Sequence, residues 1–144
     1  MNALRFSSLA LGTLLLAACG SSDPVADYRS SVEGTIAACG EISYPQQGCP
    51  IGAPEAVDCL VKATAECSVS HLRWTLPTVE GDPIVYDAFV RTTAGGCDLV
   101  WFVDTSADAF AGNPGVREEH CTGVDASEEQ RGCALPRLSG CRTP

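Results

Sequence analysis

The sequence predicts an α+β domain in which one amphipathic helix packs on a three- to four-stranded antiparallel meander and disulfides hold the two together. Three observations support this fold class. A helical period over residues 54–67 is followed by extended, alternating segments between residues 70 and 124. The 144 residues are enough for one domain and short for two. The nine cysteines indicate a disulfide-rich protein.

Residues 54–67 carry the clearest helical signal. Pro54 suits the first turn of a helix, with Gly52 or Ala53 before it as the cap. At about 100° per residue, the charged side chains fall on one side of this helix and the apolar side chains fall on the other. The charged side contains Glu55, Asp58, Lys62 and Glu66.

Two cysteines within this helix restrict the disulfide pairing. Cys59 and Cys67 are eight residues apart, so they lie ~12 Å apart along a helix axis. A disulfide requires its two Cα atoms to lie within ~7 Å. Cys59 and Cys67 therefore cannot bond to each other, and each must join the helix to another part of the chain.

Four extended segments follow the helix, at residues 70–79, 83–91, 97–105 and 116–124. The first alternates apolar and polar residues, which is typical of a half-buried strand. Pro77 lacks an amide donor and places this strand at an edge or at a bulge. The third is apolar on both alternations from Leu99 to Val103, as expected for a central strand that is covered on both faces.

The pairing of the other cysteines stays open in the sequence, because eight cysteines allow 105 connectivities. Cys39 and Cys49 bracket a Gly- and Pro-rich loop, and a bond between them is the simplest guess. A hairpin centred on Ala109 would place Cys97 opposite Cys121, at bonding distance. Cys133 and Cys141 either pair locally or join the tail to the helix.

Residues 1–18 have the pattern of an export signal. Arg5 is their only charge, and the apolar run from Leu9 to Ala18 is too short to span a membrane. The run ends in Leu16-Ala17-Ala18-Cys19, and here the sequence resembles a bacterial lipoprotein precursor. The resemblance implies that a peptidase cuts before Cys19, that its sulfur and new amine are acylated, and that the protein stays anchored to a membrane.

Lipidation would remove Cys19 from the thiol pool and leave an even number of cysteines in an oxidising compartment, which predicts four disulfides. The eight are Cys39, Cys49, Cys59, Cys67, Cys97, Cys121, Cys133 and Cys141. Gly20, in place of Asp, resembles lipoproteins that are sorted to the outer membrane. We expect residues 19–38 to form a tether, in which Asp23-Pro24 favours a short helix, and residues 39–144 to form the domain.

The charge balance restricts the partners. Eighteen acidic residues stand against nine basic ones, which argues against binding to nucleic acid or to anionic lipid headgroups. The partners we expect are the membrane, through the lipid anchor, and a protein that the sequence does not identify. No cofactor motif is present.

Candidate metal ligands are sparse. Asp104, Ser106 and Asp108 alternate as at the start of a calcium loop, but Ala109 stands where that loop needs Gly and Gly115 where it needs Glu. The alternative is an ordinary turn, and the sequence favours it. Zinc would need three or four ligands, and the chain offers His71 and His120, next to Glu118 and Glu119, without recognisable spacing.

The aromatic residues of the strands allow two interpretations. Trp74, Tyr86, Phe89, Trp101 and Phe102 either line a ligand groove or form the core under the helix, and their alternate spacing favours the core. On the opposite face of the sheet, Phe89, Phe102 or Val85 would then form an exposed apolar patch, which is the expected recognition surface.

These observations predict a non-enzymatic lipoprotein of the bacterial outer membrane that faces the periplasm or the cell surface and acts as a binding or envelope-structural module. A protease inhibitor is the alternative, with residues 106–115 as its inhibitory loop. A metal-dependent hydrolase ranks last, because no set of acid, base and nucleophile is recognisable.

Overall fold

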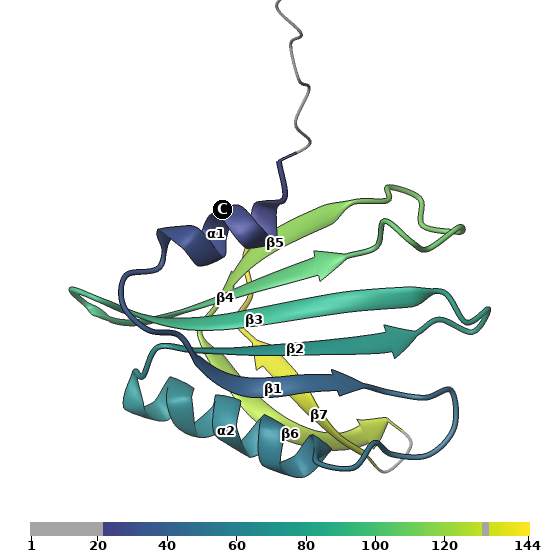
Figure 1. Cartoon of the computed structure of the whole chain (residues 1–144), viewed down its shortest axis with the longest axis horizontal. Helices are drawn as coiled ribbons and strands as arrows, with labels where there is room; N and C mark the ends of the chain where they lie inside the picture. Colours follow the sequence, from purple (N-terminus) through teal and green to yellow (C-terminus); the bar gives the residue numbers. More distant parts are fainter. Residues whose placement is uncertain (1–21, 131–132) are drawn as a thin grey trace, which may run out of the picture.

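The computed structural model describes residues 22–130 and 133–144 (Figure 1). Within these residues the chain forms two helices and seven strands in two sheets. The order along the chain is α1 (Pro24–Ser31), β1 (Ala37–Ser43), α2 (Ala53–Glu66), β2 (Ser70–Pro77), β3 (Pro83–Thr93), β4 (Gly96–Asp104), β5 (Val116–Cys121), β6 (Gly123–Gln130) and β7 (Cys133–Ser139).

The large sheet has the strand order β1-β2-β3-β4-β5, and β6 and β7 form a separate hairpin. Strands β2 to β5 pair antiparallel in sequence order, as the predicted meander requires. The predicted fold class is correct in combining helices with such a sheet and in its four disulfides. It is wrong in its single helix and in a purely antiparallel sheet, because β1 pairs parallel to β2.

Strand β1 lies in a stretch with almost no apolar pattern. Ile42 is its only buried residue, because β1 is an edge strand. Its position depends on contacts distant in sequence: Cys39 is bonded to Cys59 of α2, and the backbone of Gly40 approaches α2 closely. A Cβ atom at Gly40 would lie 3.7 Å from that of Ala56. Local sequence therefore gives little indication of this strand.

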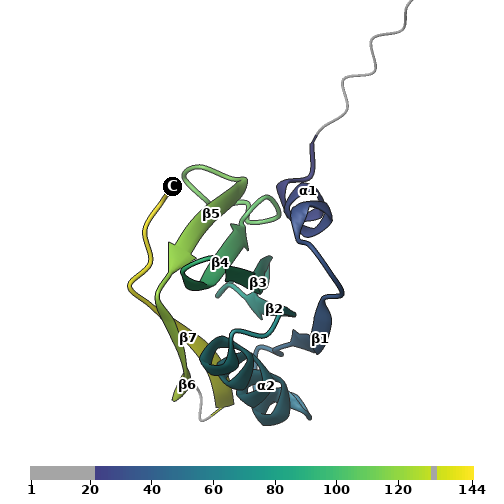
Figure 2. The same cartoon turned by 90° about the vertical axis from the view of Figure 1, so that its left-hand side faces the viewer.

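Helix α2 packs on one face of the sheet together with the β6–β7 hairpin (Figure 2). It begins after Gly52 and ends before Cys67, and both of these capping residues adopt left-handed backbone angles. Val57 and Leu60 are fully buried in the main core, against residues such as Leu72 and Val90. The helix predicted at residues 54–67 is confirmed with a shift of one residue at each end.

Helix α1 covers the opposite face of the sheet (Figure 2). Asp23 caps it by accepting the amide protons of Val25 and Ala26, so the expected short helix is present. Val25 and Tyr28 pack on Phe89 and Phe102 in a second core. The prediction of an exposed patch is therefore wrong: Phe89 and Phe102 are each only 1% exposed, because α1 lies over them.

The tail forms β6 and β7, where the sequence suggested an irregular segment. Val124 and Leu135 reach the main core from this hairpin, and β7 contacts α2. Pro136 and the glycines near the hairpin weaken its strand pattern in the sequence. Burial against α2 stabilises a hairpin that would be marginal alone.

Four disulfides connect elements that are distant in sequence: Cys39–Cys59, Cys49–Cys133, Cys67–Cys97 and Cys121–Cys141. Cys59 and Cys67 each join α2 to another element, as the helix geometry requires. The guessed bonds from Cys39 to Cys49 and from Cys97 to Cys121 are wrong, and Cys133 bonds neither to Cys141 nor to the helix.

The register of β4 and β5 explains the error at Cys97. Asp104 opposes Val116, so the turn is centred on Phe110 and not on Ala109. Cys121 consequently lies opposite Leu99. A shift of the turn by one residue moves the cross-strand partner by two positions, so the side chain stays on the same face while the partner changes.

Candidate functional site

The predicted lipidation residue, Cys19, lies outside the described residues. The eight remaining cysteines are all present in the four disulfides. Among the described residues, no helix is long and apolar enough to cross a membrane.

The predicted metal candidates lie at the end of β4 and in the loop that follows it. Asp104 accepts the amide proton of Ser106, and Asp108 accepts that of Phe110. These are the local hydrogen bonds by which Asp stabilises a turn. In the part of the chain that the structure describes, no three His, Cys, Asp or Glu side chains gather as a metal site.

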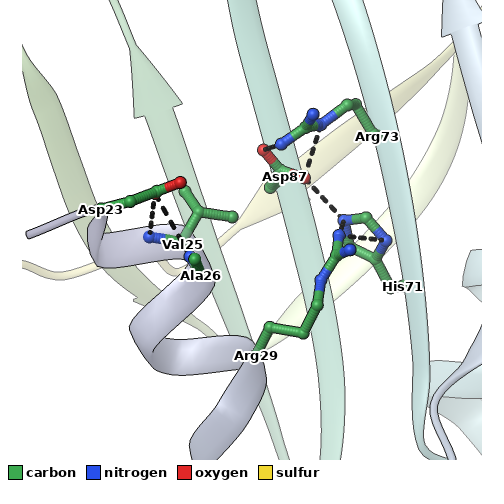
Figure 3. A network of polar contacts seen from close by, with 7 residues as sticks. All are labelled: Asp23, Val25, Ala26, Arg29, His71, Arg73 and Asp87. Carbon is green, nitrogen blue, oxygen red and sulfur yellow. Dashed lines mark hydrogen bonds and ion pairs between the residues drawn. The ribbon is translucent and has the colours of Figure 1, made fainter.

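His71 belongs to a polar network, centred on the buried Asp87, on the face that α1 covers (Figure 3). Its Nε2 lies 2.6 Å from Oδ1 of Asp87, and Arg73 donates two hydrogen bonds of 2.9 Å to the same carboxylate. Arg29 of α1 lies within 3.4 Å of both ring nitrogens of His71. The network satisfies the buried Asp87 and connects α1 to the sheet.

His120 belongs to a second network on the same face. It contacts Asp98 at 3.2 Å and Glu118 at 3.0 Å, and Arg91 donates two hydrogen bonds to Asp98. His71, Phe89, Val100 and His120 are successive cross-strand partners. The two histidines are thus three strand spacings apart, about 14 Å, and the structure does not bring them together.

Both networks consist of imidazole, guanidinium and carboxylate groups. Among the described residues, the hydrogen bonds of both imidazoles go to arginine and carboxylate side chains, with no hydroxyl or thiol partner. A nucleophile must lie within hydrogen-bond reach of its base.

Three neighbouring loops form a distinctive surface at one end of the sheet, at the right of Figure 1. We call this surface the three-loop end; it consists of residues 44–52, 78–82 and 105–115. Gln46 of the first loop lies against Gly81 of the second loop. A Cβ atom added at Gly81 would be 3.1 Å from Nε2 of Gln46. The amide of Ala109 in the third loop donates a 3.0 Å hydrogen bond to Asp82.

Each of these loops exposes one large apolar side chain. Ile51 is 106% exposed, Val79 is 92% exposed and Phe110 is 74% exposed. Within the described residues, these three are the only large hydrophobic side chains that are exposed to this extent. Single exposed apolar residues are common on protein surfaces, and the feature that distinguishes this end of the sheet is that three adjoining loops each carry one.

The loop that carries Phe110 is held by its own hydrogen bonds. The Thr105 amide donates to the carbonyl of Gly115 at its base, at 2.9 Å. Asp108 accepts the amide proton of Phe110 through its side chain and that of Ala111 through its backbone carbonyl. Together with the bond from Ala109 to Asp82, these contacts present Phe110 on an ordered turn.

The charge of the three-loop end is entirely negative. The loops contain Glu80, Asp82 and Asp108 and no Lys or Arg. Acidic loops are repelled by the anionic headgroups that attract basic segments. The surface thus has the opposite sign to the basic segments that bind such headgroups.

The sequence offered only weak signals for this site. The sequence indicated residues 106–115 as a candidate loop, but it did not point to Ile51 or Val79. Each of the three is the one large apolar residue of its loop, and an isolated large apolar residue in a predicted turn is the available signal. The proximity of the loops follows from the strand order, which the sequence does not show.

Comparisons with known proteins add no functional assignment. No family model matches the chain, and no curated protein or solved structure matches it.

Proposed function

We propose that this chain is an exported, lipid-anchored, non-enzymatic module that binds another protein through the three-loop end. One observation carries the proposal: Ile51, Val79 and Phe110 project from three adjoining loops into solvent. Aromatic side chains on ordered loops are frequent anchors of protein interfaces. The partner surface has an apolar pocket for Phe110 and basic groups that face Glu80 and Asp82.

A photo-crosslinking amino acid at position 110 tests this interface in intact cells. We expect one discrete crosslinked protein, which disappears when Ile51 and Val79 are both changed to serine. A label at Lys62 is the matched control, because this side chain is 74% exposed on α2, away from the loops. Equal crosslinking from both positions, or crosslinks only to lipid from position 110, would contradict the proposal.

Phe110→Ala is expected to weaken binding of the captured partner by about 30-fold or more, the effect of removing an interface anchor. Its free energy of unfolding should stay within about 0.5 kcal/mol of that of the parent protein, because the side chain is mostly exposed. Isothermal titration calorimetry and urea unfolding measure the two quantities. A large loss of stability would assign Phe110 a structural role.

The lipid anchor is tested at the amino terminus of the mature protein. We expect cleavage before Cys19, acyl groups on Cys19 and a membrane-bound protein, whereas Cys19→Ala should release the protein from the membrane. Mass spectrometry with and without a reductant also counts the disulfides, because each reduced bond adds two hydrogens. An unacylated mature terminus would contradict the anchor.

Protease inhibition is the second candidate, favoured by the ordered loop at residues 105–115 with Phe110 exposed on it. A protease that prefers aromatic residues is the expected target in this case. Phe110 lies in a turn closed by Asp108 and not in an extended segment. The loop would therefore inhibit by covering the active site of the protease, without binding as an extended substrate does. Inhibition of a chymotrypsin-like protease by the parent protein, but not by Phe110→Ala, would favour this candidate. If the parent protein does not inhibit such a protease, the proposed binding of a protein that is not a protease remains.

A further inference from the structure

A groove on the hairpin side of the large sheet is lined by large apolar side chains. It has a volume of about 280 Å³ and lies between the sheet and the β6–β7 hairpin. Trp74, Tyr86 and Trp101 line it from the sheet, and Leu135 and Leu138 line it from β7. Both walls of the groove therefore offer apolar surface to a bound molecule.

The groove continues to the three-loop end through a second, smaller hollow. This hollow has a volume of about 40 Å³ and shares Leu76 and Leu135 with the groove. It is also lined by Pro45 and Gly48, which belong to the first loop of the three-loop end, and by Pro77, which directly precedes the second loop. An apolar path thus leads from the loops onto the face of the sheet.

The walls of this path are held by a disulfide and by stacked rings. Cys133 lines the smaller hollow and is bonded to Cys49 of the first loop. The Tyr86 ring lies between the two indoles, 5.2 Å from Trp74 and 5.8 Å from Trp101, with interplanar angles of 6° and 18°. Because these contacts fix the walls before a partner arrives, the entropic cost of binding is lowered.

The length of the path suits a short extended peptide. It runs from the loop after β1 to Trp101 on β4, and these two strands are three spacings apart in the sheet. Three spacings are about 14 Å, which about four extended residues span at about 3.3–3.6 Å each. Alternate side chains of an extended segment point to the same side, so every second residue of such a segment faces the groove.

The charge of the surface changes between the loops and the groove. The loops carry Glu80, Asp82 and Asp108. Among the described residues that line the groove and the smaller hollow, Arg137 is the one charged side chain. A segment that crosses both regions therefore needs basic groups at the loops and uncharged apolar residues in the groove.

We propose that the protein partner of the three-loop end lays an extended segment into this groove. Basic residues of the segment face Glu80 and Asp82, and about four uncharged, mainly aliphatic residues follow the groove. Their side chains pack between the aromatic stack of the sheet and the leucines of β7. The inference rests on the proposed function, because one partner occupies both the loops and the groove.

Photo-crosslinking from the groove tests whether one partner reaches both regions. A small diazirine amino acid at position 138 labels the groove, and the label at position 110 reports on the loops. Both labels should capture the same protein, and mass spectrometry should place both adducts in one continuous stretch of its sequence. A label at Ser139 is the matched control, because this exposed neighbour points to the other side of β7, and it should not capture the partner.

A synthetic peptide with the sequence of that stretch measures the contribution of the groove. The chain has two tryptophans, and both line the groove, so the indole signals in a ¹H–¹⁵N spectrum of the mature chain with Cys19→Ala report on the site. We expect the peptide to shift these signals saturably. Leu138→Asp should weaken peptide binding about tenfold or more by removing an apolar interface contact, whereas Ser139→Asp should leave the affinity nearly unchanged.

The outcomes separate this inference from the proposed function. If position 110 captures a partner but position 138 captures no protein or only lipid, the inference is wrong and the proposed function stands without it. Adducts in two separate stretches of the partner, or a peptide that leaves the indole signals unchanged, would also overturn the inference. If position 110 captures no protein, both proposals fail. A dispersed amide spectrum verifies that each variant is folded, and if Leu138→Asp does not fold, the indole shifts in the parent protein decide.

Discussion

Replacing both Cys49 and Cys133 with alanine is expected to lower the free energy of unfolding by about 4–5 kcal/mol. This bond connects residues 84 positions apart, the longest separation of the four disulfides. Closing a long loop restricts the unfolded chain more than closing a short one. The bond also joins the first loop of the three-loop end to β7, and Cys133 is buried in the main core.

The matched control replaces Cys39 and Cys59, which are only 20 positions apart. For that pair the chain-entropy relation predicts about 3 kcal/mol. Urea unfolding, followed by circular dichroism, measures both variants against the parent protein. If the two double variants lose equal stability, or if the Cys39–Cys59 variant loses more, the argument from loop length is wrong for this fold.

Asp87→Asn is expected to destabilise the protein by about 3 kcal/mol or more. Asp87 is 2% exposed and accepts hydrogen bonds from His71 and Arg73. The amide of asparagine has one acceptor oxygen and no charge, so the partners lose a buried counter-ion, a change that typically costs about 3–5 kcal/mol. Because Arg29 of α1 contacts His71, we expect α1 to loosen in this variant.

Asp98→Asn is the control for Asp87→Asn, because Asp98 has a similar pair of hydrogen bonds from Arg91 but is more exposed to solvent. We expect it to cost about 1 kcal/mol or less. Amide hydrogen exchange measures the loosening of α1, and thermal or urea unfolding measures the stability. Equal losses in the two variants would show that burial of Asp87 does not set the size of its contribution.

The carboxylate of Asp87 also predicts how the stability of the protein depends on pH. Burial alone would raise the pKa of Asp87, but the hydrogen bonds from His71 and Arg73 outweigh it and hold the pKa below its ordinary value of 3.8. A lowered pKa stabilises the folded protein above the ordinary value and loses this contribution as the pH falls through the folded value. The stability difference between the parent protein and Asp87→Asn should therefore shrink below about pH 4, as unfolding at several pH values would show. A constant difference would contradict the assignment.

The sequence predicted the elements whose signal is local. The side-chain period at residues 54–67 is that of α2, and the alternation at residues 70–79 is that of β2, because each pattern depends only on which side of a short segment is buried. The exclusion of a Cys59–Cys67 bond was equally secure, because it follows from the rise of a helix alone. Lipidation at Cys19, by contrast, stays a prediction.

Only the tertiary structure decided which elements meet. β1 has one buried residue and depends on Cys59 and Ala56 of α2, which are distant in sequence, so nothing local identifies it. Phe89 and Phe102 are buried because α1 lies over them. The apolar run from Leu99 to Val103 predicted that β4 is covered on both faces, but no local pattern reveals which element covers the second face. Ile51, Val79 and Phe110 become one surface because the strand order places three loops at the same end of the sheet. Local patterns record whether a residue prefers to be buried, whereas the partners that bury or expose it are chosen by the packing of the whole chain.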